Sequence, residues 1–210
     1  MDDDLQKSYD IVAGYYAAEF QAELEHKPFD RKMLDWLIEK VADGAIICDM
    51  GCGPGQIARY LRDRRAETCG IDLSNGMVRQ ASRLNPDIIF DQGDMRALTR
   101  VAENSFGGIA AFYSIIHIQR SSLVNVFREF HRVLKPAGVL LLTFHIGKEQ
   151  VHRDEWWGKK VSINFLFFET AEIKRCLLEG GFQLSEVIER DPYPEVEYQS
   201  RRAYIFATKT

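Results

Sequence analysis

The stretch IICDMGCGPGQIARYL, residues 46–61, decides the fold of this chain. It opens as an apolar run, passes through glycines at Gly51, Gly53 and Gly55, and closes in a helical pattern. Glycines at alternate positions indicate backbone that turns sharply or is approached closely. Because doubly wound α/β folds hold nucleotides at such a turn between a strand and its helix, the stretch predicts a ligand site.

Strands and helices alternate on both sides of this turn. We predict strands over 45–50, 68–72, 88–91, 106–113 and 139–144. We predict helices over 8–25, from Pro28 to Asp43-Gly44, over 56–65 and over 76–84. A further helix is expected after a capping Ser121, and KPAG then turns the chain into the strand over 139–144. Continuous apolar strands alternating with amphipathic helices are typical of a parallel sheet covered on both faces.

The last third of the chain follows a different pattern. Residues 151–160 are polar, and the alternation of Val161, Ile163, Phe165 and Phe167 favours a strand. A helix over 170–179 and strands over 182–190 and 202–208 complete the expected elements. The connection between the last two strands contains no helix, so we expect them to pair antiparallel.

The spacing of the glycines separates two classes of ligand. A dinucleotide site uses G-x-G-x-x-G/A, whereas this chain has D-x-G-x-G-x-G from Asp49 to Gly55, with Gln56 in place of the last small residue. At these residues the chain resembles the class I S-adenosylmethionine-dependent methyltransferases. CGIDLS, QGDMRAL, FGGIAAFYSIIHI and HRVLKPAGVLLLTFH follow in that family's order, so the resemblance covers about residues 46–145.

The resemblance implies a fold, a cofactor and a set of site residues. The fold is an α/β doubly wound, seven-stranded, mostly parallel sheet of the Rossmann-like methyltransferase type, with an antiparallel last strand and an N-terminal helical lid. It implies one methyltransferase domain over 1–210, made of a lid (1–43), a cofactor-binding core (44–145) and a substrate-side insertion with a C-terminal hairpin (146–210). S-adenosylmethionine is the implied cofactor and S-adenosylhomocysteine the product. The implied cofactor-binding residues are Tyr16, Asp49, Gly51, Cys52, Gly53, Gln56, Asp72, Leu73, Met77, Asp94, Met95 and Ser114.

Within that set the resemblance gives two acids particular roles. Asp72 lies about 20 residues after Gly51, where the family's acid accepts the ribose hydroxyls, although NAD sites use an acid at the same place. Asp94 stands where the family binds the adenine amino group. Each feature also has a structural explanation: the glycines can form a tight turn, and each acid can cap a helical turn.

The implied reaction is in-line transfer of a methyl group to a small-molecule acceptor. His117 follows the fourth strand and is the candidate general base, with a packed core histidine as the alternative. Tyr16 is the lid residue expected to reach the cofactor, or else belongs to a packed aromatic stripe. A non-catalytic S-adenosylmethionine-binding regulator and an NAD-dependent oxidoreductase remain as alternatives.

Three features after the fifth strand are further candidates for the substrate side. Trp156 and Trp157, with charged neighbours, suit a small amphipathic ligand. His145, His152 and Glu149 can share a helix face as a metal trio, but we favour a solvated face and predict no metal. Arg201 and Arg202 can meet an anionic substrate or be ordinary surface charges.

Composition limits the partners. The 210 residues are 46% hydrophobic and carry a net charge of −4, without the basic stripe of a nucleic-acid binder. We find neither an apolar run long enough for a membrane span nor a signal segment, and no paired cysteine motif. The sequence therefore predicts a cytoplasmic enzyme acting on a small molecule, not on nucleic acid or a membrane, and leaves the oligomeric state open.

Overall fold

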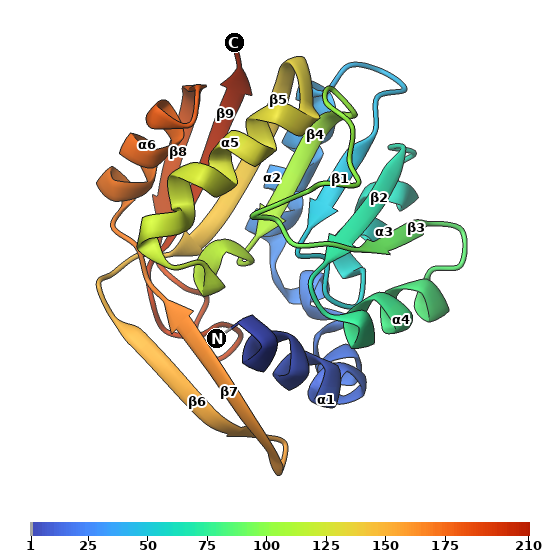
Figure 1. Cartoon of the computed structure of the whole chain (residues 1–210), viewed down its shortest axis with the longest axis vertical. Helices are drawn as coiled ribbons and strands as arrows, with labels where there is room; N and C mark the ends of the chain where they lie inside the picture. Colours follow the sequence, from blue (N-terminus) through green and yellow to red (C-terminus); the bar gives the residue numbers. More distant parts are fainter. Residues whose placement is uncertain (1) are drawn as a thin grey trace.

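A seven-stranded sheet runs through the middle of the protein (Figure 1). The computed structural model describes residues 2–210. In spatial order the strands are β3 (Ile89–Gln92), β2 (Thr68–Asp72), β1 (Ile47–Met50), β4 (Phe106–Phe112), β5 (Leu134–His145), β9 (Arg202–Lys209) and β8 (Phe182–Arg190). Only β9 runs against its neighbours, β5 and β8, so the predicted doubly wound sheet with an antiparallel last strand is confirmed.

Helices cover both faces of this sheet. They are α1 (Asp2–Phe20), α2 (Pro28–Lys40), α3 (Gln56–Asp63), α4 (Asn75–Leu84), α5 (Leu123–Val133) and α6 (Thr170–Glu179), with short 3₁₀ turns η1 (Glu23–His26), η2 (Ile115–His117) and η3 (Arg120–Ser122). One apolar core lies between the sheet and α5 and α6, and a second lies between the sheet and α2 and α3. The expected alternation of buried strands and amphipathic helices is therefore confirmed.

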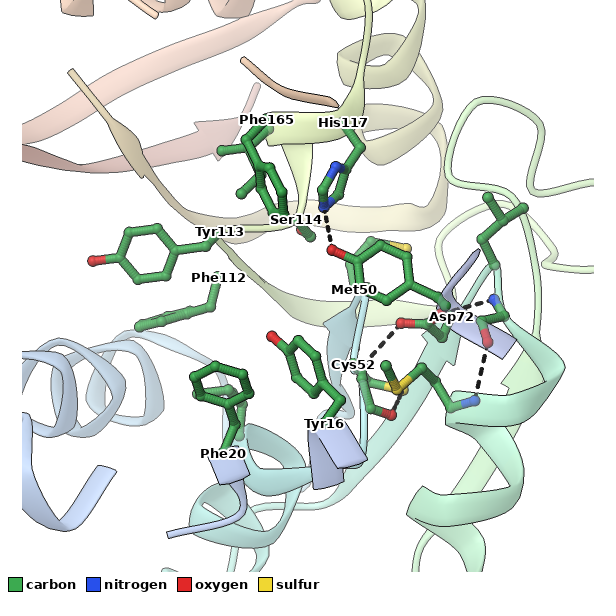
Figure 2. Close-up of a pocket in the computed structure, with 18 of the residues that line it drawn as sticks. Tyr16, Phe20, Met50, Cys52, Asp72, Phe112, Tyr113, Ser114, His117 and Phe165 are labelled. Atoms are coloured by element: carbon green, nitrogen blue, oxygen red, sulfur yellow. Dashed lines mark hydrogen bonds between the residues drawn. The ribbon is translucent and has the colours of Figure 1, made fainter. Parts of the chain in front are cut away.

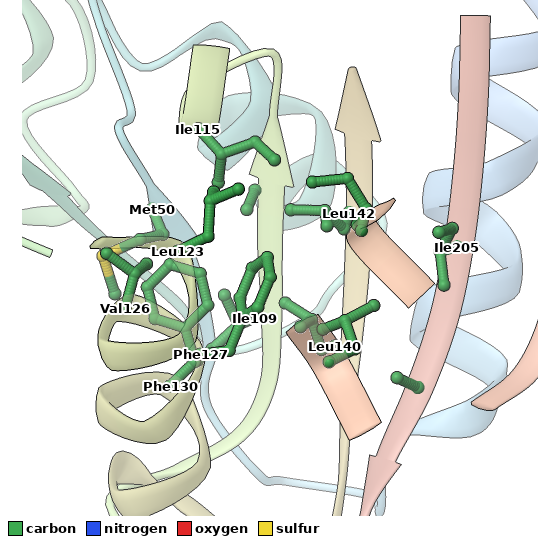
Figure 3. Packing of buried hydrophobic residues seen from close by; sticks show 14 of the residues in the cluster. Met50, Ile109, Ile115, Leu123, Val126, Phe127, Phe130, Leu140, Leu142 and Ile205 are labelled. Carbon is green, nitrogen blue, oxygen red and sulfur yellow. The ribbon is translucent and has the colours of Figure 1, made fainter. Parts of the chain in front are cut away.

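The core under α5 shows why this order of residues forms a helix on a sheet. Leu123, Val126, Phe127 and Phe130 recur at helical spacing and turn one face toward Ile109 and its neighbours on β4 and β5 (Figure 3). All of them are fully buried. Each such side chain contributes about 1.5–3 kcal/mol through the apolar surface it removes from water, which fixes α5 against the sheet.

A separate two-stranded hairpin stands apart from the main sheet. Strands β6 (Gln150–Trp156) and β7 (Lys159–Leu166) pair antiparallel and lie across α1 (Figure 1). Val12 of α1 packs with Val161 and Ile163 of β7 in a small apolar cluster of its own. The N-terminal helix and the segment after β5, far apart in the sequence, therefore form one layer over the carboxyl ends of the strands.

Several local expectations are wrong. Residues 150–156 form a strand, so His145, His152 and Glu149 share no helix face. Ser121 does not cap α5: Ser122 precedes it, and its side chain makes no capping hydrogen bond because the η3 turn occupies the approach. KPAG leads into the strand pairing that begins at Val139, as expected, but as an irregularity within β5, with a positive φ at Ala137.

Two findings concern binding partners in general. No described helix has the length and apolar character needed to cross a membrane. In residues 2–210, no cluster of His, Cys, Asp or Glu side chains has the arrangement of a metal site.

Candidate active site

The glycine turn between β1 and α3 has left-handed backbone at each glycine, with φ of 76° at Gly51, 52° at Gly53 and 86° at Gly55. A Cβ on Gly51 would lie 2.4 Å from Cβ of Ser114, and one on Gly55 would lie 2.9 Å from the nearest side-chain atom. At Gly53 the nearest atom would be 3.8 Å away, on Tyr16. The two ends of the turn are therefore closely packed, whereas its middle presents open backbone below Tyr16.

A cavity of about 370 Å³ opens beside this turn, at the carboxyl ends of β1, β2 and β4. In Figure 2, Tyr16 and Phe20 approach it from α1, and Phe112 and Tyr113 from the end of β4. Strand order reverses between β1 and β4, the place where open α/β sheets bind ligands. The cavity brings together the residues that the resemblance implies for the cofactor and the candidate base: Tyr16, Asp49, Gly51, Cys52, Gly53, Gln56, Asp72, Leu73, Met77, Asp94, Met95, Ser114 and His117.

Asp72 ends β2 and is held by backbone groups on either side. Its Oδ2 accepts from the N–H of Gly53 at 2.9 Å, and its Oδ1 from the N–H of Ser74 at 2.8 Å. Burial raises the pKa of Asp72 to about 6, although these two donors pull it down. The carboxyl group therefore links the glycine turn to the start of α4, and Asp72 is itself part of the cavity wall.

Asp49 has a different orientation. Its Oδ2 accepts from the N–H of Ala58 at 3.1 Å, so the carboxyl group ties β1 to α3. Burial raises its pKa to about 8, with the N–H of Ala58 opposing and the charge of Asp72 adding to the rise. Asp49 thus supports the turn from behind as well as bordering the cavity.

Asp94 meets Arg96 within its own loop. The carboxylate accepts from the backbone N–H of Arg96 and from its guanidinium in a two-pronged contact. Burial would raise the pKa of Asp94, but the hydrogen bonds and charge of Arg96 bring it below its usual value. The structure therefore shows the turn-forming role of Asp94 and also places it in the cavity wall.

Beside the glycine turn, two buried polar atoms of the wall lack a hydrogen-bond partner within residues 2–210, namely Oγ of Ser114 and Oε1 of Gln56. The Gln56 amide nitrogen is already bound, at 2.8 Å, to Glu23 of η1. Buried polar atoms without partners are costly, so they indicate that a ligand completes them. Polar atoms beside an open glycine backbone fit the amino-acid part of S-adenosylmethionine, and the Asp72 carboxyl group fits its ribose.

His117 is buried and bonded at both ring nitrogens. Its Nδ1 lies 2.9 Å from the carbonyl oxygen of Asn164, and its Nε2 lies 2.8 Å from the hydroxyl of Tyr9. Only a protonated Nδ1 can donate to that carbonyl, so we assign the proton to Nδ1 and Nε2 accepts from Tyr9 (Figure 2). Burial lowers the pKa of His117 to about 4.

Tyr9 is a site residue that the sequence analysis missed. It lies on the same face of α1 as Tyr16, seven residues before it, and their rings are 6.0 Å apart. Both rings contact Trp156 of the β6–β7 hairpin, at 6.3 and 5.7 Å. The sequence did contain a signal for Tyr9: it lies seven residues before Tyr16, and residues at i and i+7 lie on the same face of a helix.

At the end of the cavity beyond Ser114, the earlier candidates His145 and Arg202 line the wall, whereas Lys27, Tyr113 and Glu197, which also line it, were not predicted. Of the earlier substrate-side candidates, Trp156 lines the cavity but Trp157 does not, and His152 instead bonds to Asn164. Arg201 is exposed and pairs with Glu189 and Asp191.

Comparison with known proteins shows what this chain is similar to. A family model described as a methyltransferase domain matches residues 47–138. A putative methyltransferase of Bacillus subtilis, YqeM, is 28% identical over 134 residues, 62% of this chain and 54% of that protein. A malonyl-[acyl-carrier protein] O-methyltransferase of Pseudescherichia vulneris is 31% identical over 134 residues, 63% of this chain and 52% of the relative. The aligned part of the chain thus spans about half the length of these relatives.

Solved structures agree on the fold. An S-adenosylmethionine-dependent methyltransferase from Methanosarcina mazei superposes with a TM-score of 0.73 at 16% identity, covering 82% of this chain and 96% of that one. One from Clostridium acetobutylicum gives 0.70 at 16%, covering 96% and 98%. Residues 47–138 therefore match a methyltransferase domain family, and the chain as a whole has the fold of solved S-adenosylmethionine-dependent methyltransferases.

Proposed function

We propose that this protein transfers a methyl group from S-adenosylmethionine to a small-molecule acceptor. The observation that carries the proposal is the pairing of Asp72 with the Gly53 backbone inside a cavity at the strand-order reversal. The sulfonium of the bound cofactor supplies an activated methyl group. The chain's own contribution is to hold both reactants in line and to exclude water.

We assign the cofactor to the half of the cavity between the glycine turn and α4. Gly51, Cys52, Gly53, Gln56 and Ser114 surround the amino-acid part in this assignment. Asp72, Leu73 and Met77 surround the ribose, Asp94 and Met95 the adenine, and Asp49 supports the turn. Tyr16 covers this half from α1, which fits a lid formed by residues 1–43 over a core of 44–145, with 146–210 on the acceptor side.

The size of the cavity supports a small acceptor. About 370 Å³ is near the lower end of ligand pockets, and it has to hold both cofactor and acceptor. All four cysteines are free thiols, which supports our further proposal that the protein works in the cytoplasm.

His117 is our candidate for the proton acceptor, acting through Tyr9. Because Nε2 of His117 already accepts the Tyr9 hydroxyl, a substrate proton can reach the imidazole only by way of that hydroxyl or after Tyr9 moves. Tyr9 is the group of this pair that belongs to the lid, so closing α1 assembles the pair.

Calorimetric titration tests the proposal. We expect S-adenosylmethionine and S-adenosylhomocysteine to bind in the micromolar range, NAD not to bind, and Asp72→Ala to abolish binding. Binding of NAD alone, or of none of the three, would contradict the proposal.

A second experiment separates catalysis from binding alone. One relative, from Talaromyces variabilis, is named an S-adenosyl-L-methionine-dependent Diels-Alderase, so binding the cofactor does not establish methyl transfer. We expect a panel of small acceptors to include one that releases S-adenosylhomocysteine in proportion to a methylated product. Tight cofactor binding without product from any acceptor would favour a non-catalytic role.

A further inference from the structure

The part of the cavity beyond Ser114, which we call the acceptor end, has a wall made mainly of rings. His145 is at its centre, with its ring centroid 5.1 Å from those of Phe167 and Tyr113 and inclined to them by 25° and 34°. Tyr198 stands across the edge of this group, 5.8 Å from Phe167. Near-parallel rings of this kind favour stacking with a flat ligand.

Tyr113 lines this wall with its backbone in an unusual, left-handed conformation. Its φ is 48°, a conformation that costs energy in a residue with a bulky side chain. Its N–H is held by Oγ1 of Thr143 at 3.0 Å, and its hydroxyl lies 3.2 Å from that of Tyr204. Strain kept in place by surrounding bonds is typical of binding sites.

Charged groups of both signs border the acceptor end, and the acids already have donors. Glu197 accepts two hydrogen bonds from Arg190, at 2.7 and 2.8 Å, and one from the N–H of Tyr193. Asp30 accepts from Tyr204 and from Arg190, neither of which lines the cavity. These carboxylates are therefore neutralised from behind the wall.

The third acid, Glu23, is likewise engaged, by Gln56 and Lys27. The ammonium group of Lys27 has three N–H donors, and among the described residues it pairs with the carboxylate of Glu23. Lys27 therefore has donors left for a ligand. No acid of the acceptor end thus remains to attract a cation.

Arg202 has donor capacity left. It is 3% exposed, and its Nη1 donates to the carbonyls of Tyr198 and Ser200. Its Nε lies 3.3 Å from Glu197 but has no aligned hydrogen bond in the described chain. The guanidinium and the Lys27 ammonium lie 5.7 and 5.9 Å from the centroid of the Tyr113 ring, so both cations approach the same ring.

The pKa of His145 agrees with this arrangement of charged groups around the acceptor end. Burial, and then the charges of Arg202 and Lys27, lower its pKa to about 3, whereas Glu197 opposes the shift. Burial and the two nearby cations therefore keep the imidazole of His145 a neutral ring.

We infer that the acceptor is a planar aromatic carboxylate, its ring lying against the His145, Tyr113 and Phe167 rings and its carboxylate meeting Lys27 and Arg202. The inference rests on the proposed function. A flat apolar body is what the ring wall binds, and an anion is what the available N–H donors bind. A cationic acceptor would meet two cations and no free carboxylate.

Calorimetry with S-adenosylhomocysteine present tests the inference. The probes are 4-hydroxybenzoate, 1-hydroxy-2-naphthoate and the neutral carboxamide of each. We expect at least one acid to bind about tenfold more tightly than its amide, the equivalent of one charge-assisted contact. Equal binding of acids and amides, or binding of neither acid, overturns the inference.

Two variants separate the charge from the rings. Lys27→Met should remove most of the acid's advantage over its amide, while Phe167→Leu should weaken both by a similar factor. Lys148→Met is the matched control, because Lys148 is exposed and does not line this cavity. An undiminished preference for the acid in Lys27→Met would overturn the role of the charge.

The same titrations keep the two proposals apart. If S-adenosylhomocysteine binds and no acid does, the acceptor assignment fails and the proposed cofactor site stands. If S-adenosylhomocysteine itself does not bind, the proposed function fails first.

Discussion

Asp49 is a carboxyl group that the fold has removed from water and given one backbone donor, the N–H of Ala58. Its folded pKa, about 8, lies above the usual value for an aspartate in an unfolded chain. A raised folded pKa means that the folded state binds more protons, so Asp49 stabilises the fold at low pH. That contribution is lost as pH rises from the unfolded value to about 8.

Asp49→Asn should therefore flatten the pH dependence of stability. The asparagine oxygen keeps the bond from Ala58 but cannot ionise. Measured by thermal unfolding without ligand between pH 5 and 9, the midpoint of the wild-type protein should fall toward pH 8 more steeply than that of the variant. Parallel curves would show that Asp49 does not titrate in this range.

His117 leads to a second prediction at the scale of single residues. If it accepts the proton by way of Tyr9, then His117→Ala and Tyr9→Phe should each lower turnover about 10²-fold or more, because general bases contribute on that order. Cofactor affinity in His117→Ala should change far less. Turnover is measured at saturating acceptor and cofactor, and an unchanged value in His117→Ala would leave it a packing residue.

The pH profile adds an independent check. Burial lowers the pKa of His117 to about 4, so the imidazole is neutral and able to accept a proton throughout the range above it. The wild-type rate should show no loss of activity near the ordinary histidine pKa of about 6.5. A step there that disappears in His117→Ala would mean that the ring is more exposed during turnover.

At the scale of elements, α1 is attached to the start of α4 by Asp10. Oδ1 of Asp10 accepts from the hydroxyl of Ser74 and from the N–H of Gly76, both at 2.6 Å, at the start of α4. Gly76 allows this approach, because a Cβ there would lie 2.8 Å from Cα of Asp10. The carboxylate also favourably meets the positive end of the α4 dipole.

Asp10→Ala should loosen α1 from α4. We expect faster hydrogen exchange in α1 and weaker binding of S-adenosylhomocysteine, by about 1–3 kcal/mol, because two hydrogen bonds to a charged group are lost. Asp43→Ala is the control, since Asp43 is an exposed acid between α2 and β1. If exchange in α1 is unaltered by Asp10→Ala, other contacts hold the helix.

Most elements of the main sheet were predictable from the sequence because their patterns are local. β2, α6 and β8 have the bounds expected from apolar periodicity and glycine punctuation. The β6–β7 hairpin lying across α1 was not predictable in the same way. The alternation of Val161, Ile163 and Phe165 did indicate β7, but the polar residues of β6 gave no period that distinguishes strand from helix. The packing of β7 on Val12 joins segments about 150 residues apart.

The candidate site also divides into a part that local sequence patterns predict and a part that only tertiary contacts bring together. The half of the cavity that we propose for the cofactor consists largely of a contiguous motif and two acids placed after strands, so the sequence was enough to group these residues. The acceptor end takes Lys27 from the junction of η1 and α2, Tyr113 from the residue after β4 and Arg202 from β9. Only tertiary structure brings these residues together, and the left-handed backbone of Tyr113 has no signature in an ordinary aromatic residue.

At the scale of the whole molecule, one buried charge network joins the two ends of the chain. Arg190 of β8 binds Glu197 and Asp30 of α2, and Tyr204 of β9 donates to Asp30. Burial would raise the pKa of Glu197, but the bonds from Arg190 and the N–H of Tyr193 bring it below its usual value. The network thus fixes the connection between β8 and β9 that forms part of the acceptor end.

Glu197→Gln should consequently destabilise the whole protein. It keeps the shape of the side chain but leaves Arg190 and Arg202 without their shared carboxylate, and breaking a buried ion pair costs about 3–5 kcal/mol. Thermal unfolding at neutral pH should show a midpoint lower by roughly 10 °C. Glu195→Gln, at an exposed position of the same loop, should leave it nearly unchanged.

The sign of the pH dependence makes this prediction specific to the charge. Because the folded pKa of Glu197 is depressed, its contribution is present above the unfolded value of about 4.3 and disappears as pH falls through the folded pKa. The gap between the wild-type protein and Glu197→Gln should therefore narrow below about pH 4. A gap that stays constant down to that pH would mean that the variant disturbs packing, and that the carboxylate charge does not hold the two ends of the chain together.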